Sequence, residues 1–433
     1  MFKNITNTFF TNILIRLIMF GLMFVNTHLF KAEGWGTIGL LTADLAIIQL
    51  FSYLIGGSAL VYLIPRRNFF QILFFTYIWL CISNALGVMI LFYCNMVPEG
   101  FVWQLFILTF CASLFFTSTT ILQAREEVKK FNLYNILQTA CLTLLFLFFI
   151  LIKKVSINYY LVALTSSYFL LFCKSLTFIK IKKEDVHFHE FKPLLKEMCS
   201  LGIFTQLANL AQILNYRMSI FFIEWFIGRK WVGIYNAGNQ FSEAIWAVPK
   251  SISFVQYARI SNTNDMEYAR KLSLSLFKIS GLFSVIAVIV LCLIPASLFG
   301  IILGHEEFAS IKIVIYALAP GIVSLACLSI LSHYFSGRGY YWVNTIGSVI
   351  GLCTVVTLGL IFIPEALKIS NTRALFVAAL STSCAYFANL VFTFIMFKIK
   401  TKSNVVHFLI NKEDIKIAMG EIKKYFGLHV NNY

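Results

Sequence analysis

Three cations interrupt long apolar stretches of this sequence, and their side chains are of the types that bind phosphate groups. Arg16, Arg217 and Lys250 lie inside or at the ends of runs long enough to cross a membrane. A charged group at such a depth is costly unless it faces water or a partner, so each of them is a functional candidate. Arginine and lysine are the usual partners of phosphate oxygens. The three cations therefore predict a site for an anionic solute.

Polar residues accompany Arg217 on its predicted helix. At about 100° of rotation per residue, Gln206 and Glu224 project within about 20° of Arg217, and Asn209 lies close by. A helix with such a polar stripe has one wet face. Catalytic residues and metal ligands are not indicated by this pattern.

A second polar stripe, about 80° wide, follows on the next predicted helix and contains Asn236, Gln240, Glu243 and Lys250. Arg217 and Glu243 are expected at similar depths, so a structural ion pair between them is one interpretation. The other is a water-filled cavity with a net positive lining, because the acids at matching depth are too few to neutralise the cations.

The first half of the sequence repeats this arrangement with fewer charges. Arg16 is expected nearer the side of the N-terminus, and Asp44 nearer the opposite side, which separates them too far in depth for a salt bridge. Asp44, Glu224 and Glu243 are the carboxylates that either couple transport to an ion or form ion pairs. The role of Asp44 in ion coupling is a hypothesis.

The composition places these residues in a membrane protein. Of the 433 residues, 59% are hydrophobic and only 12% are charged, and the mean hydropathy is +0.81. Soluble domains are about one quarter charged, so a soluble enzyme and a disordered protein are excluded. The predicted fold class is all-α, a polytopic membrane protein with about twelve transmembrane helices.

Each helix that crosses a membrane needs about 20 apolar residues. Breaks are expected where turn residues and charges coincide, as at Gly34-Trp35-Gly36 and at Pro65-Arg66-Arg67-Asn68. The predicted helices are 8–29, 37–64, 69–93, 101–123, 131–152, 158–179, 198–227, 232–258, 272–299, 311–334, 341–363 and 373–397.

Lysine and arginine are distributed unequally between the two sides of these helices. With a cytoplasmic N-terminus, 22 of the 35 lie on the inner side, eight on the outer side and five inside or at the ends of spans. The positive-inside rule therefore predicts that both termini are cytoplasmic. The net charge of +16 is then mostly explained by the basic residues that orient the helices in the membrane, and it requires no nucleic-acid partner. The basic tail either lies on anionic lipid headgroups or is solvated.

The longest basic loop falls between the sixth and seventh predicted helices, which indicates two six-helix lobes. A weak internal repeat supports a duplication, because two similar segments begin corresponding helices, Trp35-Gly36-Thr37-Ile38 and Trp231-Val232-Gly233-Ile234. The expected divisions are an N-terminal lobe, residues 1–180, a basic connector, 181–197, a C-terminal lobe, 198–397, and a basic tail, 398–433.

Other classes of function lack their signatures in the sequence. No GxxxxGK[ST] run is present, so an ATP-driven pump would need a partner ATPase. The outer loops are too short for the catalytic site of a polymerase or an acyltransferase. Ten cysteines never approach CxxC spacing and are expected to act as small hydrophobic residues, with no metal and no redox cofactor. We therefore expect a protein that is not an enzyme.

Two stretches carry a resemblance to a known family. One runs from Gly34-Trp35-Gly36 through Gly56-Gly57-Ser58-Ala59 to Pro65-Arg66. The other runs from Arg217-Met218-Ser219-Ile220 through Val232-Gly233-Ile234-Tyr235 to Pro249-Lys250-Ser251-Ile252. They resemble the polysaccharide-biosynthesis (O-antigen, Wzx-type) flippases of the multidrug/oligosaccharidyl-lipid/polysaccharide (MOP) exporter superfamily, and they cover about a quarter of the chain.

The resemblance implies a two-lobed bundle of the MATE-like MOP fold with a central cationic cavity. By position, Arg16, Arg217 and Lys250 become the residues that bind the pyrophosphate of an undecaprenyl-linked oligosaccharide, while Gln206, Asn209, Asn236 and Gln240 line the same cavity. The expected function is transport of a lipid-linked repeat unit of O-antigen, capsule or exopolysaccharide by alternating access.

The expected setting follows from that function. It is the bacterial inner membrane, where the protein acts as a monomer with no cofactor, in contact with membrane lipids and with glycan-assembly proteins as candidate partners. A gradient of H⁺ or Na⁺ or the membrane potential is the expected source of energy. The alternatives are a cation-coupled multidrug antiporter of the same fold and, more distantly, a membrane-embedded glycan polymerase or acyltransferase.

Overall fold

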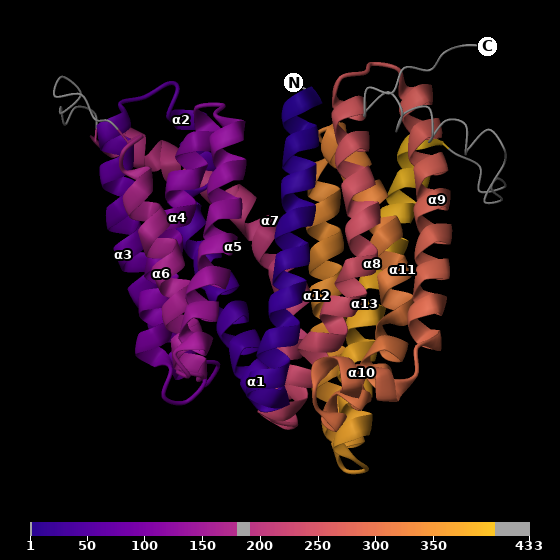
Figure 1. The fold of residues 1–433 in the computed structure, drawn as a ribbon. Helices are drawn as coiled ribbons and strands as arrows, with labels where there is room; N and C mark the ends of the chain where they lie inside the picture. Colours follow the sequence, from indigo (N-terminus) through magenta and orange to yellow (C-terminus); the bar gives the residue numbers. More distant parts are fainter. Residues whose placement is uncertain (1, 180–190, 403–433) are drawn as a thin grey trace, which may run out of the picture. The chain divides into compact units, whose positions relative to one another are not determined.

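The computed structural model describes residues 2–179 and 191–402, which fold into helices with no strand among them (Figure 1). The expected all-α class is confirmed. Internal contacts divide the chain into two compact units, unit 1 (residues 1–213) and unit 2 (residues 214–433), and the division lies within α7 (Phe191–Phe226). Residues 191–197 of the expected connector form the start of α7, whereas the rest of the connector and most of the basic tail lie outside the described residues. The lobe boundaries expected from the sequence stay a prediction.

Unit 1 contains the first six expected spans, two of them covered by α1 and α2, together with the first part of α7. Four of its helices agree with the expected spans to within a few residues. The helices of unit 1 are α1 (Phe2–Gly56), α2 (Ser58–Leu63), α3 (Phe69–Tyr93), α4 (Val102–Ala124), α5 (Val128–Leu151) and α6 (Ile157–Ser175). Within the unit, α1 packs against α3, α4 and α5, and α4 packs against α6.

The first two expected spans are joined differently from the prediction. A turn at Gly34-Trp35-Gly36 was expected, but these residues are helical and buried, and the break lies at Lys31, where φ is 58° and ψ is −170°. One non-helical residue thus joins the two halves of α1. The second span is also interrupted near its end at Gly57, where φ is −104° and ψ is −117°, outside the helical region. The sequence pattern missed both breaks, since neither is marked by proline.

Unit 2 contains the remaining helices, with a break in the expected ninth span. That span was predicted as 272–299, but α9 ends at Leu293, and Pro295 is the N-cap of a separate short helix. The helices after α7 are α8 (Arg229–Ser261), α9 (Met266–Leu293), α10 (Ala296–Leu303), the 3₁₀ turn η2 (Glu306–Ser310), α11 (Ile311–Gly337), α12 (Tyr341–Leu367) and α13 (Asn371–Thr401).

Helix α11 lies at the centre of unit 2 and packs against α8, α9 and α13. Small residues allow close approach of the outer helices, as is usual in membrane bundles where dispersion and fit drive association. At Gly351 on α12, a Cβ would lie 2.5 Å from the side-chain nitrogen of Asn215 and 3.2 Å from the carbonyl oxygen of Ala385. This glycine therefore fixes the distance of α12 from α7 and α13.

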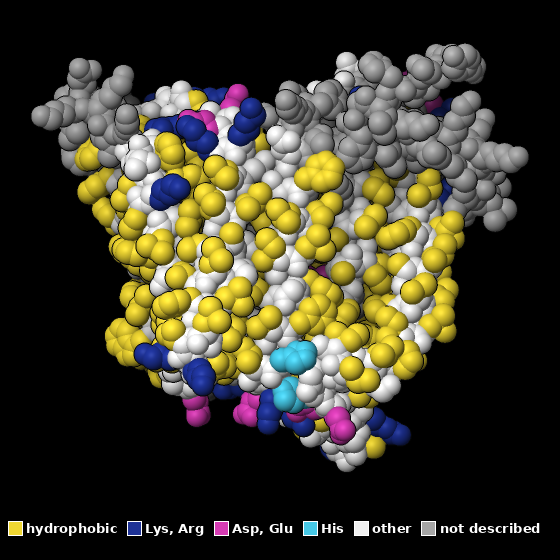
Figure 2. All heavy atoms as spheres, viewed as in Figure 1, with side chains coloured by type: hydrophobic (Ala, Val, Ile, Leu, Met, Phe, Trp, Pro, Cys, Tyr) yellow, Lys and Arg dark blue, Asp and Glu magenta, His cyan; other side chains and the backbone are white. Residues whose placement is uncertain are grey.

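The surface agrees with a membrane environment. Apolar side chains cover the sides of the helices in Figure 2, and the visible lysine and arginine side chains gather near helix ends. Among the described residues, eight helices are long and apolar enough to cross a membrane, and the first, Phe10–Leu63, covers two expected spans. Helices α6, α7 and α8 fall outside this set because they are more polar; α8 alone contains Arg229, Lys230, Glu243, Lys250 and Arg259.

Replacing Gly351 with valine is expected to destabilise unit 2, because the added atoms have no space beside Asn215 and Ala385. Overpacking of this kind costs about 1–3 kcal/mol. The apparent melting temperature of the protein in detergent, followed by fluorescence-detected size exclusion, measures the loss. Gly21→Val is the matched control, because a Cβ at Gly21 meets nothing within 4 Å. Equal melting temperatures for the two variants would contradict this account of the packing.

Candidate functional site

Two buried tyrosines lie beside the opposite charges of unit 2. Tyr235 of α8 and Tyr386 of α13 are 1% and 7% exposed, and each interacts electrostatically with both Arg217 and Glu243. The hydroxyl group of Tyr235 forms a hydrogen bond of 3.2 Å with the Thr382 hydroxyl. Because α7, α8 and α13 each supply part of this cluster, the position of Arg217 depends on the packing of three helices.

The two opposite charges do not form an ion pair. Among the described residues, no carboxylate oxygen lies within 4.0 Å, the limit for an ion pair, of the Arg217 guanidinium. Glu243 instead accepts a hydrogen bond of 2.8 Å from the Asn239 side chain. Arg217 is half-buried, as is Gln240, whereas Asn236 is 7% exposed. The guanidinium thus keeps its capacity to bind an anion, which favours the cavity interpretation over the structural ion pair.

Lys250 lies on the same polar face of α8, one turn beyond Trp246. Its ammonium group is 4.4 Å from the centroid of the Trp246 ring, a cation–π contact. The indole N–H donates a hydrogen bond of 2.7 Å to the Ser329 hydroxyl on α11, and a ring nitrogen of His333 is 2.8 Å from the Ser329 carbonyl oxygen. His333 also interacts electrostatically with Lys250. Trp246, Ser329 and His333 were absent from the sequence-based candidates, although Trp246 lies within about 60° of Glu243 on α8.

Glu224 forms an ion pair in the structure. Its carboxylate pairs with Arg229 at the start of α8, at 2.8 and 3.1 Å from two guanidinium nitrogens. The side chains are 26% and 17% exposed for Arg229 and Glu224. Helical periodicity on α7 could not reveal this pair, because the partner comes from the next helix. Of the two roles open to Glu224, the geometry favours the ion pair.

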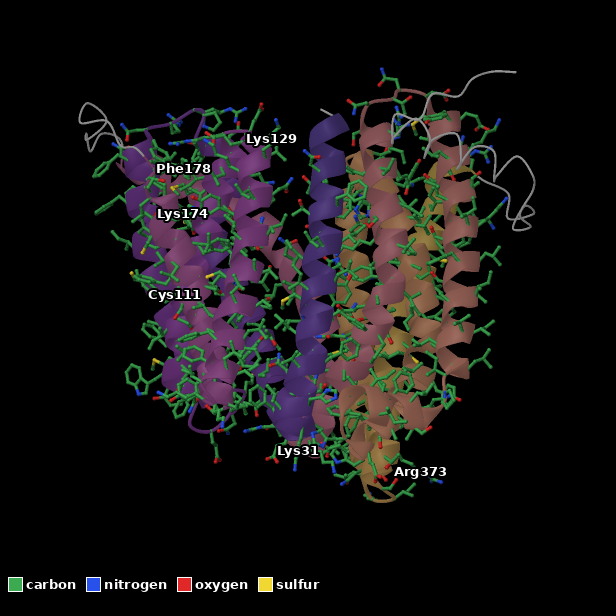
Figure 3. The ribbon with its side chains drawn as sticks, in the orientation of Figure 1. Lys31, Cys111, Lys129, Lys174, Phe178 and Arg373 are labelled. Carbon is green, nitrogen blue, oxygen red and sulfur yellow. The ribbon has the colours of Figure 1, made fainter. Side chains whose placement is uncertain are left out.

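The remaining sequence candidates lie in unit 1. Arg16 is exposed on the first half of α1, and Asp44 on the second half is fully buried. Gln206 is 8% exposed and accepts a hydrogen bond of 3.3 Å from Asn209, which is itself exposed. Figure 3 shows Lys31 and Lys129 at opposite ends of this unit, the ends that the charge distribution assigned to the outer and inner sides.

Unit 1 also contains a buried polar network that the sequence pattern did not single out. Ser52 of α1, Ser83 and Asn84 of α3 and Ser113 of α4 are mutually hydrogen-bonded at 3.2–3.4 Å. All four are at most 4% exposed. The signal available in the sequence was Asn84, an amide in the middle of an apolar run. The network joins three helices and carries no formal charge.

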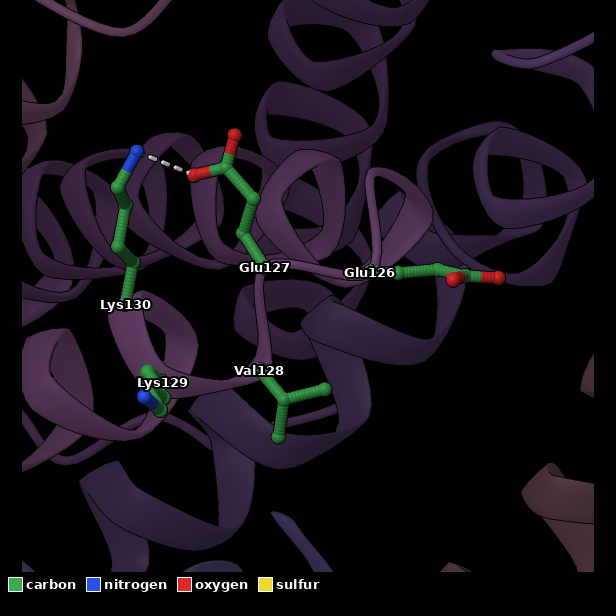
Figure 4. A pocket seen from close by; sticks show the side chains of 5 residues that line it. All are labelled: Glu126, Glu127, Val128, Lys129 and Lys130. Atoms are coloured by element: carbon green, nitrogen blue, oxygen red, sulfur yellow. Dashed lines mark ion pairs between the residues drawn. The ribbon is translucent and has the colours of Figure 1, made fainter. Parts of the chain in front are cut away.

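A pocket of about 280 Å³ lies where α4 connects to α5 (Figure 4). It is lined by Val128 and by charges of both signs, Glu126, Glu127, Lys129 and Lys130, of which Glu127 and Lys130 form an ion pair. Because its charges are balanced, it does not match the predicted cationic site. In the described part of the chain, no three His, Cys, Asp or Glu side chains are placed to hold a metal ion.

Comparison with known proteins identifies the fold. No protein-family model and no curated protein sequence matches the chain. Among solved structures, the lipid II flippase MurJ in an inward closed conformation matches with a TM-score of 0.75 and 13% identity, over 98% of this chain and 93% of MurJ. An inward-facing multidrug resistance MATE family transporter of the MOP superfamily matches with a TM-score of 0.69 and 14% identity, over 90% and 96% of the two chains.

A eukaryotic MATE transporter, AtDTX14, matches with a TM-score of 0.58 and 13% identity, over 98% of this chain and 97% of that one. The chain therefore has the MOP fold, and the fold expected from the sequence is confirmed. At these identities the similarity concerns the fold alone.

The Glu224–Arg229 pair predicts a measurable coupling. Glu224→Gln and Arg229→Gln are each expected to lower stability by about 1 kcal/mol or less, because the pair is partly exposed. The double variant should lose no more than one single variant, since both changes break the same contact. Apparent melting temperatures of the four proteins measure the cycle. Additive losses would show that the two side chains do not interact.

Proposed function

We propose that this protein is a flippase that moves an undecaprenyl-pyrophosphate-linked oligosaccharide across the bacterial inner membrane by alternating access. The oligosaccharide is a repeat unit of O-antigen, capsule or exopolysaccharide. Arg16, Arg217 and Lys250 bind the pyrophosphate, and no covalent chemistry takes place. The energy comes from an ion gradient or from the membrane potential.

One observation carries this proposal. Arg217 is half-buried on a helix of a membrane bundle, and none of the described carboxylates pairs with it. A cation in that position is costly unless water or an anionic ligand compensates it. The planar guanidinium offers paired N–H donors that match phosphate oxygens, and the flexible ammonium of Lys250 on the neighbouring helix adds a second positive charge.

The structural comparisons include a flippase. The matched MurJ structure is described as a lipid II flippase, so the fold of this chain is one that a flippase uses. Its TM-score of 0.75 exceeds that of each MATE transporter compared above. The resemblance of the Arg217 and Pro249-Lys250 segments to O-antigen flippases narrows the proposal to polysaccharide biosynthesis.

A cation-coupled multidrug antiporter is the second candidate, and Asp44 favours it. This carboxylate is fully buried in unit 1. An antiporter that exchanges a cation for a drug needs a carboxylate inside the bundle to bind the cation. That function requires Asp44 or Glu243 and makes Arg217 dispensable. The flippase function, in contrast, requires Arg217. Variants of Asp44, Glu243 and Arg217 therefore separate the two candidates.

Alanine at Arg217, Arg16 or Lys250 is expected to abolish most surface glycan in a host that depends on this protein, because each change removes a positive charge from the pyrophosphate site. Surface glycan is measured at equal protein level, with Arg373→Ala, an exposed residue at the start of α13, as the matched control. Arg217→Lys tests geometry, since retained glycan would mean that charge alone suffices. Normal amounts of surface glycan in all three alanine variants would show that these cations do not bind the pyrophosphate.

Both termini are expected on the cytoplasmic side, as the positive-inside rule predicts. A green fluorescent protein fused after Tyr433 should fluoresce, and alkaline phosphatase inserted after Lys368 should be active. The same phosphatase inserted after Arg338, in an expected inner turn, is the control and should be inactive. The reversed pattern would mean that the orientation is inverted.

A further inference from the structure

Three aromatic rings of unit 2 lie together beside the proposed pyrophosphate ligands. The ring centroids of Tyr216 and Trp246 are 6.2 Å apart, and those of Tyr216 and Tyr386 are 5.7 Å apart. The rings come from α7, α8 and α13, and Tyr216 directly precedes Arg217 in the sequence. Leu325 and Leu328 of α11 pack beneath them. The cluster therefore packs against α11, the central helix of the unit.

The Trp246 ring is held in one orientation. Its N–H donates to the Ser329 hydroxyl at 2.7 Å, and that hydroxyl donates in turn to the Leu325 carbonyl oxygen at 2.8 Å. Tyr386 is 7% exposed and forms the base of the cluster, whereas Tyr216 and Trp246 are half-buried and keep accessible surface. A ring fixed by such contacts loses little freedom when a ligand stacks on it.

Charged and polar side chains share the face of α8 that carries Trp246. Lys250 lies 4.4 Å from the Trp246 ring centroid, and Glu243 and Gln240 lie on the same face of α8. An ammonium group in contact with acyl chains is costly, so a face that carries Lys250 turns away from lipid. Half-buried aromatic rings next to a cation, on a face that turns away from lipid, are suited to a ligand that carries both sugar and phosphate.

We infer that Trp246 and Tyr216 form a stacking platform for the sugar ring next to the phosphate of the substrate, with Tyr386 as its base. The negative face of an aromatic ring attracts the C–H groups of a pyranose, as it attracts other positively polarised edges. In the structure, the Lys250 ammonium lies over the Trp246 ring, 4.4 Å from its centroid. A pyrophosphate draws this ammonium to itself, which uncovers the ring for the sugar.

This assignment rests on the proposed function and adds the residues that distinguish a glycosylated carrier from a bare one. Arg217 and Lys250 bind the pyrophosphate of either lipid. Trp246 and Tyr216 contact the sugar alone, so they set the preference for a carrier that bears its saccharide. An empty carrier then returns without competing strongly for the site.

Binding of two probes to the purified full-length protein in nanodiscs tests the assignment. The probes are undecaprenyl pyrophosphate and undecaprenyl pyrophosphate bearing one N-acetylglucosamine. In Trp246→Leu, the affinity for the sugar-bearing probe is expected to fall about tenfold, which corresponds to about 1.4 kcal/mol. The affinity for the sugarless probe is expected to stay unchanged or to rise, because Lys250 is no longer held on the ring. Tyr216→Leu should show the same selective loss.

Two further variants keep the test independent of folding. Trp246→Phe retains a ring and should lose less than Trp246→Leu, and Trp225→Leu, an aromatic residue 42% exposed on α7, should change neither affinity. Equal losses for both probes in Trp246→Leu would show that the ring only supports Lys250 and would overturn the platform. If the unmodified protein binds neither probe, the proposed function itself fails, and the platform fails with it.

Discussion

A charged side chain within the hydrocarbon region of a membrane is costly unless it meets water, an opposite charge or a ligand. The described structure distributes its ionisable residues in agreement with this constraint. Glu224 is neutralised by Arg229, whereas Arg217 forms no ion pair with a carboxylate among the described residues and interacts electrostatically with Tyr235 and Tyr386. A cation without an ion-pair partner among the described residues favours a polar ligand, and the proposed pyrophosphate site is based on it.

The helices of unit 2 build this site from contacts that hold it in place. Helix α11 supplies Ser329, which orients Trp246, and α13 supplies Thr382, which hydrogen-bonds Tyr235. Close packing at Gly351 sets α12 against the helices that carry these groups. An arginine and a lysine on neighbouring helices are therefore presented by a rigid framework, which lowers the cost of ordering them when an anion binds.

The sequence was sufficient for the fold and for the charged candidates, but not for their partners. Continuous apolar runs predicted most helices to within a few residues, because each span must satisfy its backbone internally. They did not predict the break at Lys31, where one residue in the left-handed region replaces a turn. Periodicity on α7 put Glu224 on the same face as Arg217, but it could not predict the contact with Arg229, which comes from α8. The aromatic neighbours of Lys250 were missed for the same reason, since Ser329 is remote in sequence.

The most direct test of the account is a structure of the protein in nanodiscs with undecaprenyl pyrophosphate-linked oligosaccharide, determined by electron cryomicroscopy. Phosphate density is expected at about 2.7–2.9 Å from the guanidinium nitrogens of Arg217, the distance of a charge-assisted hydrogen bond. Acyl chains packed against Arg217, or a carboxylate closed onto it while the phosphate lies elsewhere, would contradict the central claim.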